Sequence, residues 1–193
     1  MNGLLNGRSA KLPGMPKARS GDTKARIQAV ALDLFAEQGM QQTSLRQIAD
    51  RLGVTKPALY YHFASREELV SSLVTPLFDD FNTYVEEQEA AASADPRALL
   101  ESYFDLAYKH RRLIQVALSD MTVLHRLDLA SKFIDWRQRL IALLIGPDPS
   151  LDQQVRGMVT LGGLSDCAVM FEHVDPADLR AAAVAAAVDT LQA

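Results

Sequence analysis

The sequence predicts an all-α protein with about nine helices, and three observations support that fold class. Ala and Leu are abundant among the 193 residues and β-branched residues are sparse, which favours helix over strand. Apolar residues recur at helical spacing and nowhere alternate as they would in a half-buried strand. Residues that begin or end helices punctuate the chain throughout. A chain of this length can also bury a sizeable core.

The N-terminal segment differs in composition from the rest of the chain. Residues 1–21 are rich in Gly, Pro, Asn and Ser and carry four basic side chains, so we expect a flexible basic arm. The arm either adds phosphate contacts beside a DNA site or has no role. The first helix is expected to begin near Asp22 or Thr23, either of which can cap it, and to end at Gly39.

The next two helices are short and carry clear caps. Ser44 and Gln47 form a capping-box pattern at the start of the second helix, which ends at Gly53. Thr55 caps the third helix, and Pro57 lies in its first turn, where the missing N–H costs nothing. We therefore expect a three-helix domain over residues 22–68.

The same signals predict helices throughout residues 69–193. Expected helices cover 65–92, 95–110, 111–118 and 121–144, followed by one opened by Asp148-Pro149 and one opened by Asp175-Pro176. Pro in the first turn after an acidic cap is favourable because that position needs no N–H donor.

The second and third helices have the spacing of a helix-turn-helix. Ala49 is small enough for the close helix crossing, Gly53 allows a left-handed turn, and Leu59 faces back into the small core. Ile48, Leu52 and Val54 complete that core. The outward residues are polar, basic or aromatic, as a helix entering the major groove requires: Arg46, Gln47, Thr55, Lys56, Ala58, Tyr60, Tyr61 and His62. The alternative is an ordinary solvated helix face.

Charge and composition limit the classes of protein. Residues 1–70 carry ten Lys and Arg against six Asp and Glu, while residues 71–193 carry ten against eighteen. A basic end on an acidic chain is typical of a nucleic-acid-binding end. Cys167 is the only cysteine, and no apolar run approaches the roughly 18 residues that span a bilayer. These features, and the lack of a continuous apolar stretch in residues 1–21, favour a cytoplasmic protein.

The stretch Thr23–Val70 resembles the DNA-binding domain of the TetR family of bacterial transcriptional regulators. The resemblance rests on the blocks LFAEQG, TSLRQIA, LGVTKPALYYHF and SREEL, and it covers about a quarter of the chain strongly. It implies that phosphates are held by Thr43, Ser44 and Arg46 and again by Arg66. It also implies that Lys56, Pro57, Ala58, Tyr60 and His62 lie along the recognition helix, with Lys56 and Ala58 contacting bases.

The resemblance further implies a homodimer that binds a palindromic operator and is released by a small-molecule effector, with repression as the family default. The dimer would form through the last two helices. Their composition agrees independently, because the last helix reads LRAAAVAAAVDTL and small residues allow close approach. Packing within one subunit is the alternative.

An effector pocket would lie in the C-terminal domain and take a largely apolar molecule. Candidate lining residues are Tyr103, Tyr108, His125, Phe133, Trp136 and Met158. Such residues at helical spacing can also be simple core, and His125 and Trp136 on the expected long helix are the best candidates.

An enzyme and a helical scaffold are the rival classes. The segment Gly163–Cys167 superficially resembles a nucleophile elbow but lacks its second glycine and its preceding strand. The four histidines show no metal-ligand spacing and there is no glycine-rich phosphate loop, so we expect no catalysis, metal or cofactor. A scaffold would leave the tyrosine–histidine face unexplained.

Overall fold

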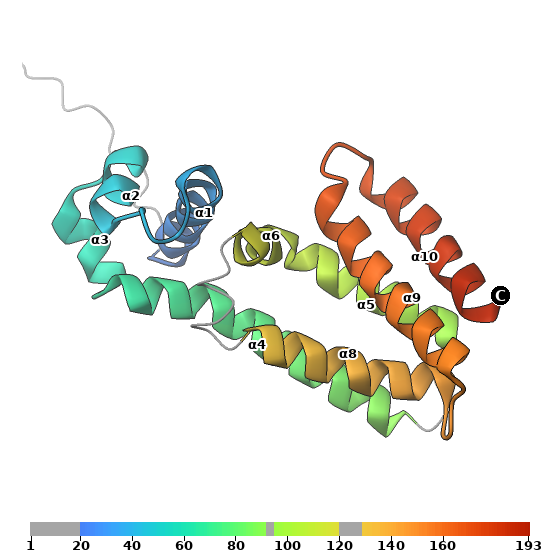
Figure 1. Ribbon diagram of the computed structural model, residues 1–193. Coiled ribbons are helices and arrows are strands. Elements are labelled where there is room, and N and C mark those ends of the chain that lie inside the picture. The colour runs from blue at the N-terminus through green and yellow to red at the C-terminus, as the bar shows by residue number, and fades with distance from the viewer. Residues whose placement is uncertain (1–19, 92–94, 120–128) are drawn as a thin grey trace, which may run out of the picture.

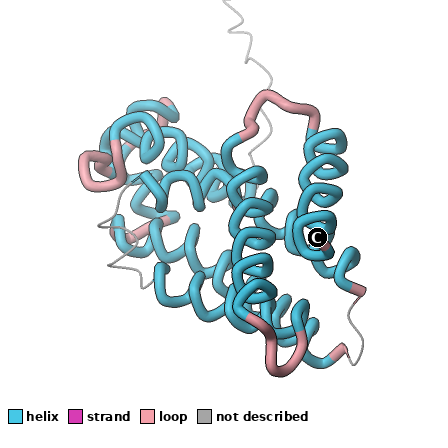
Figure 2. Tube along the Cα trace, turned by 45° about the vertical axis from the view of Figure 1, so that its right-hand side comes forward, coloured by secondary structure: helices cyan, strands magenta, loops and turns pink. Residues whose placement is uncertain are grey.

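The computed structural model describes residues 20–91, 95–119 and 129–193, and within these ranges every regular element is a helix (Figure 1). The prediction of an all-α fold with about nine helices is confirmed for this part of the chain. The nine helices described are α1 Ser20–Gln38, α2 Leu45–Leu52, α3 Lys56–His62, α4 Arg66–Ala90, α5 Pro96–Lys109, α6 Arg111–Ser119, α8 Leu129–Ile145, α9 Leu151–Met170 and α10 Pro176–Gln192. Figure 2 shows these helices joined by short loops.

Most of the predicted helix starts are confirmed by their caps. Ser44 and Gln47 form the full capping box of α2, and Thr55 accepts a hydrogen bond from the Ala58 amide at the start of α3. Asp95 and Asp175 cap α5 and α10, each with proline in the first turn. Local sequence determines these ends because each cap needs only residues within one turn.

The cap of α9 differs from the prediction, whereas that of α4 lies where the expected helix begins. Asp148-Pro149 does not open α9: Asp148 has a left-handed φ of 55°, and Ser150 caps the helix through a capping box with Gln153. At α4, Ser65 caps the helix by accepting from the Glu68 amide, and the Glu68 carboxylate accepts from the Ala64 N–H.

Several predicted boundaries change or fall outside the described residues. The first helix begins at Ser20 rather than near Asp22, so it includes the last two residues assigned to the arm. Residues 1–19 of that arm are outside the described ranges. The helix expected over 121–144 is described from Leu129 as α8, and residues 121–128 are outside the description. The expected domain boundary after residue 68 falls within the first turn of α4.

The first three helices pack around a small core of their own. Ile48, Ala49 and Leu59 are buried, and Leu52 and Val54 pack against them half-buried, as predicted. Gly53 takes the left-handed conformation, with φ of 68°, that the turn between α2 and α3 needs. We call helices α1–α3 the head.

The remaining helices form the body. Helix α4 leaves the head and continues along the body, where it packs on α8 (Figure 1). Helices α5, α9 and α10 pack against one another, and α6 contacts both α1 and α9. Buried apolar side chains from the head and the body join in one continuous core. No helix within the described ranges is long and apolar enough to span a membrane.

Candidate nucleic-acid interface and effector site

One side of helix α3 packs against the head, and the opposite side is exposed to solvent. Leu59 is fully buried in the head, whereas Lys56, Pro57 and Ala58 are exposed. Tyr60 is 41% exposed and Tyr61 is 82% exposed. Large aromatic rings are usually more buried than this. A capped helix anchored by one leucine therefore presents its opposite face to solvent.

The aromatic side chains of α3 are ordered by contacts with neighbours on the same helix. The Lys56 ammonium lies 5.4 Å from the centre of the Tyr60 ring. The rings of Tyr61 and His62 meet edge to face at 5.3 Å. These contacts place a cation, two phenols and an imidazole side by side on one short helix.

The start of α2 brings further polar groups toward this face. Ser44 and Gln47 are exposed, but their side chains are engaged with each other in the capping box. Arg46 is exposed and lies 3.8 Å from the Asp50 carboxylate, a contact of little strength between two solvated side chains. Arg46 thus remains accessible to an anion.

Thr43 does not lie where the family resemblance placed it. Its side chain is buried, and Oγ1 lies 2.9 Å from the Gly39 carbonyl, to which it donates. The same oxygen accepts a hydrogen bond from Nε2 of Gln38 at 3.0 Å. The hydroxyl therefore connects α1 to the start of α2 and is not available to a phosphate in this conformation.

Arg66 and Arg51 are also engaged inside the head. The Arg66 guanidinium is half-buried and donates to the Met40 carbonyl, while its buried Nε has no partner among the described residues. Arg51 pairs with Glu37 at 2.7 Å, and this hydrogen bond holds the pKa of the Glu37 carboxyl below its ordinary value. Arg66 can reach a phosphate only from its exposed edge.

Lys24 is a candidate that the sequence did not identify. It is exposed on α1, and its ammonium lies 5.5 Å from the centre of the buried Phe63 ring, directly after α3. Basic residues near the start of a helix are common, so only the packing of α1 beside the end of α3 reveals this position.

Three of the six residues predicted for the effector site lie around one ring that the prediction missed. Phe81 of α4 stacks on Trp136 with centres 4.9 Å apart, and it meets Phe133 at 5.9 Å and Tyr103 at 6.3 Å. Nε1 of Trp136 donates to Oδ1 of Asn82 at 2.7 Å. We call Phe81, Tyr103, Phe133 and Trp136 the aromatic cluster.

The other predicted effector residues do not join the aromatic cluster. Tyr108 stacks on Phe104, and the Arg111 guanidinium covers its ring at 3.9 Å. Met158 is 47% exposed on α9, so it lies on the surface of the body. His125 falls outside the described residues. Thr160 is a further buried hydroxyl that has no hydrogen-bond partner within the described ranges.

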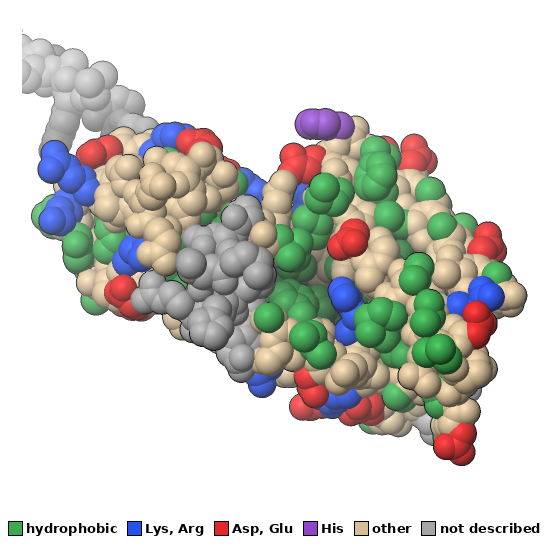
Figure 3. Space-filling model, viewed as in Figure 1, with side chains coloured by type: hydrophobic (Ala, Val, Ile, Leu, Met, Phe, Trp, Pro, Cys, Tyr) green, Lys and Arg blue, Asp and Glu red, His purple; other side chains and the backbone are tan. Residues whose placement is uncertain are grey.

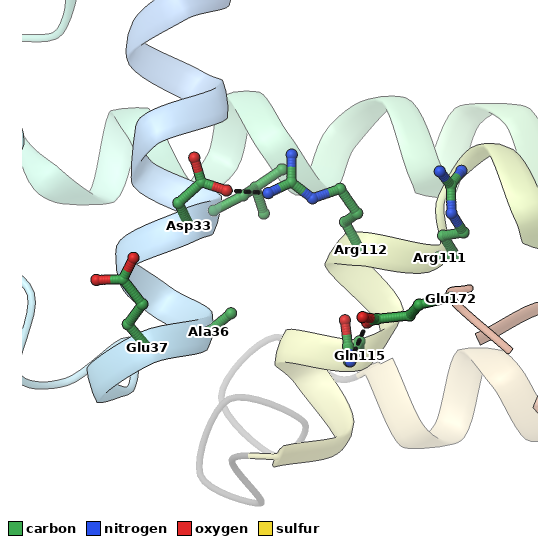
Figure 4. A pocket seen from close by; sticks show the side chains of 8 residues that line it. Asp33, Ala36, Glu37, Arg111, Arg112, Gln115 and Glu172 are labelled. Carbon is green, nitrogen blue, oxygen red and sulfur yellow. Dashed lines mark hydrogen bonds and ion pairs between the residues drawn. The ribbon is translucent and has the colours of Figure 1, made fainter. Parts of the chain in front are cut away.

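One cavity of about 520 Å³ lies between the head and the body and is lined by none of the predicted residues. Its walls come from α1, from α6 and from Glu172, as Figure 4 shows. Arg112 reaches Asp33 across the cavity, and Gln115 donates to Glu172 at 2.7 Å. These charged walls join head and body but contrast with the apolar pocket that the sequence predicted.

The body also exposes apolar side chains on α9. Leu151, Val155, Met158 and Val159 are each between 47% and 76% exposed. Figure 3 shows hydrophobic side chains gathered over α9 and α10. Exposed apolar patches of this kind mark interaction surfaces.

No three His, Cys, Asp or Glu side chains come together as metal ligands within the described parts of the chain. The features described above are a polar helix face, an aromatic cluster, a charged cavity and an apolar surface.

The segment that carries the polar helix face resembles a known family of proteins. A family model described as bacterial regulatory proteins, tetR family, matches residues 27–73. The repressor KstR2 of Rhodococcus jostii is 38% identical over 81 residues, which are 42% of this chain and 39% of that protein. The regulator AcrR of Shigella flexneri is 34% identical over 84 residues, again 39% of its length. The chain spans about two fifths of the length of these curated relatives.

Solved structures resemble the chain over a greater length. A transcriptional regulator of the TerR/AcrR family from Aquifex aeolicus is 26% identical, with a TM-score of 0.63, over 85% of this chain and 96% of that one. KstR2 of Mycobacterium tuberculosis has a TM-score of 0.70 at 18% identity, over 90% of this chain and 95% of that one. The second likeness shows a shared fold.

Proposed function

We propose that the protein is a ligand-responsive transcriptional repressor of the TetR family of bacterial regulatory proteins, whose family model matches residues 27–73. It binds a palindromic operator as a homodimer and is released by a small-molecule effector. The observation that carries the proposal is α3, which one buried leucine anchors while its polar and aromatic face is exposed. The matched relatives are named as regulators or repressors, which supports a regulator over an enzyme or a scaffold.

We assign the DNA contacts by exposure. Lys56 and Ala58 contact bases, since a lysine suits guanine and a methyl side chain suits thymine. The remaining contacts grip the phosphate backbone and come from Ser44, Arg46, Gln47, Thr55, Pro57, Tyr60, Tyr61, His62 and Arg66, with Lys24 added from the structure. Thr43 supports this surface from inside the head.

The domain organisation follows from the same assignment. Residues 20–68 form the DNA-binding domain, and residues 69–193 form the effector and dimerisation domain. Because α4 crosses the boundary, the two domains share one helix. A protein with this role acts in the cytoplasm, where the chromosome lies.

The homodimer forms through α9 and α10. Helix α9 exposes apolar residues, and α10, which packs against it, exposes alanines at positions 181, 182, 185 and 186. Burying such a surface against a second copy removes apolar area from water and brings two recognition helices into successive major grooves, about 34–36 Å apart.

The effector binds beside the aromatic cluster. The cluster supplies buried aromatic rings, and Thr160 of α9 supplies a buried hydroxyl that lacks a partner among the described residues. The structurally similar KstR2 of Mycobacterium tuberculosis is described as a ketosteroid regulator, so ketosteroids are among the first compounds to test.

Operator selection from random duplex DNA tests the DNA-binding proposal. We expect a palindromic site whose binding weakens steeply with salt, and loss of that binding in the double variant Lys56→Ala, Tyr60→Ala. Lys132→Ala, at an exposed position of α8 in the body, is the matched control and should bind normally. Failure to enrich any site, or equal binding by the double variant, would refute the assignment. Transcription in vitro from the selected site then shows repression or activation.

Trp136 provides a direct reporter for the effector because it is the only tryptophan in the chain. Its emission is measured while candidate apolar ring compounds are titrated into the protein. A compound that binds beside the cluster changes this emission and lowers operator affinity at the same concentrations. A compound that releases DNA without affecting Trp136 would place the effector site elsewhere.

A further inference from the structure

Arg137 of α8 lies beside the exposed apolar surface of α9 without a counter-ion among the described residues. We propose that it pairs with Asp166 of the partner subunit, and that two such pairs fix how the two copies meet. This inference rests on the homodimer proposed above. It adds the contact that sets the register of the interface.

The position of Arg137 follows from a glycine on α9. A Cβ placed on Gly162 would lie 3.9 Å from Nη1 of Arg137, so the guanidinium extends over α9 at a residue without a side chain. Its Nε is buried and has no hydrogen-bond partner, and no ion pair reaches the side chain from the described residues. A second copy that covered this surface would bury the cation further. Burial of an unpaired charge is strongly unfavourable, so the covering surface must supply an anion.

Asp166 is the carboxylate that the surface of α9 can supply. It lies four residues after Gly162, hence on the same face of the helix, and it is exposed. Helix α9 has one other acidic residue, Asp152, which already pairs with Arg156 at 2.6 Å. Within the described ranges Asp166 forms no ion pair, and it does not reach Arg137 of its own subunit.

Two-fold symmetry relates these two groups. In a homodimer with a two-fold axis the same patch meets itself, so a contact from Arg137 to Asp166 occurs twice. Gly163 is exposed and a Cβ there would meet nothing within 4 Å, so two α9 helices can approach closely at this residue. If they cross there, residues after Gly163 in one copy lie opposite residues before Gly163 in the other. Asp166 of the partner subunit then lies near the guanidinium that covers Gly162.

Charge reversal with measurement of the dimer dissociation constant tests the pair in the full-length protein. Arg137→Glu or Asp166→Arg alone places like charges opposite each other twice, and we expect each to weaken the dimer by about tenfold or more. The double variant restores opposite charges and should return to within about threefold of the unchanged protein. Lys132→Glu, an exposed reversal elsewhere on α8, is the matched control and should leave the constant unchanged.

The outcomes separate this inference from the proposed function. Sedimentation equilibrium gives the constant, and circular dichroism verifies that each variant is helical. The ion pair is overturned if neither single reversal raises the dimer dissociation constant. It is also overturned if the double variant dimerises as weakly as the combined effects of the two single reversals predict. Either result leaves the homodimer intact. A monomer at all concentrations overturns both. The neutral variants Arg137→Gln and Asp166→Asn give a second estimate if a reversal prevents folding.

Discussion

A Cβ placed on Gly157 would lie 2.9 Å from Cγ2 of Ile141, so α9 approaches α8 at a point where no side chain fits. Gly157→Ala should therefore force Ile141 to move, at a cost of about 1–3 kcal/mol that outweighs the roughly 1 kcal/mol gained in helix propensity. We expect a lower free energy of unfolding in urea.

Gly163 provides the control in the same helix, because a Cβ there would meet nothing within 4 Å. Gly163→Ala should stabilise the protein by about 0.5–1 kcal/mol at the same subunit concentration. Equal effects of the two substitutions would show that the close contact with Ile141 does not govern packing of α9.

Thr43 should contribute to stability and not directly to DNA affinity. Thr43→Val removes the hydroxyl that donates to Gly39 and accepts from Gln38, and leaves those groups partly unsatisfied, at a cost of about 1–3 kcal/mol. Thr43→Ser keeps the hydroxyl. If Thr43→Val, verified as folded at the assay temperature, weakened operator binding while Thr43→Ser did not, Thr43 would contact DNA after all.

Substitutions at Tyr61 and Leu59 of α3 should affect different properties, operator binding at the first and stability at the second. Tyr61 is 82% exposed, so Tyr61→Ala should change the free energy of unfolding by less than about 0.5 kcal/mol while weakening operator binding. Leu59 is fully buried, so Leu59→Ala should cost about 2–5 kcal/mol. Chemical denaturation and fluorescence anisotropy at one salt concentration measure both quantities. Normal operator affinity in Tyr61→Ala would remove that residue from the interface.

The Asp80 carboxylate should make stability depend on pH in the acid range. The Lys109 ammonium, 2.6 Å away, and to a smaller extent His110 hold the pKa of Asp80 below its ordinary value. A carboxyl with a lowered pKa stabilises the fold above its unfolded pKa of about 3.9, and the contribution is lost as pH falls through the folded value.

Asp80→Asn should consequently cost about 1–2 kcal/mol at neutral pH. The difference from the unchanged protein should shrink as the pH falls below about 4. Urea titrations from pH 7 to pH 3 measure it. A difference that stays constant over this range would mean that the ion pair with Lys109 does not stabilise the fold.

The residues that sequence alone assigned correctly are those whose role is local. Ser44 and Thr55 cap helices through neighbours three residues away, and Gly53 turns the chain by its own φ. The start of α9 was misassigned because Asp148-Pro149 and Ser150-Gln153 are both plausible caps, and the left-handed φ of Asp148 decides between them.

At the sites, the positions that the sequence pattern did not anticipate depend on contacts between distant segments. Thr43 is buried because Leu34 and Gly39 of the preceding helix and turn cover it, which no pattern around residue 43 reveals. Phe81 was missed because it joins Trp136 from a helix more than 50 positions away. A periodic pattern shows that a side chain is apolar, but tertiary packing determines whether it lines a pocket, fills the core or faces a partner.

The alanine face of α10 has a thermodynamic consequence for association. Alanine has no side-chain rotamers, so Ala181, Ala182, Ala185 and Ala186 can be buried without loss of side-chain conformational entropy. Immobilising a long side chain at an interface costs about 0.5–1.5 kcal/mol instead. The alanine face therefore needs no rearrangement of side chains on association. Association should order the methionine and leucine of α9 and the proposed Arg137–Asp166 pairs.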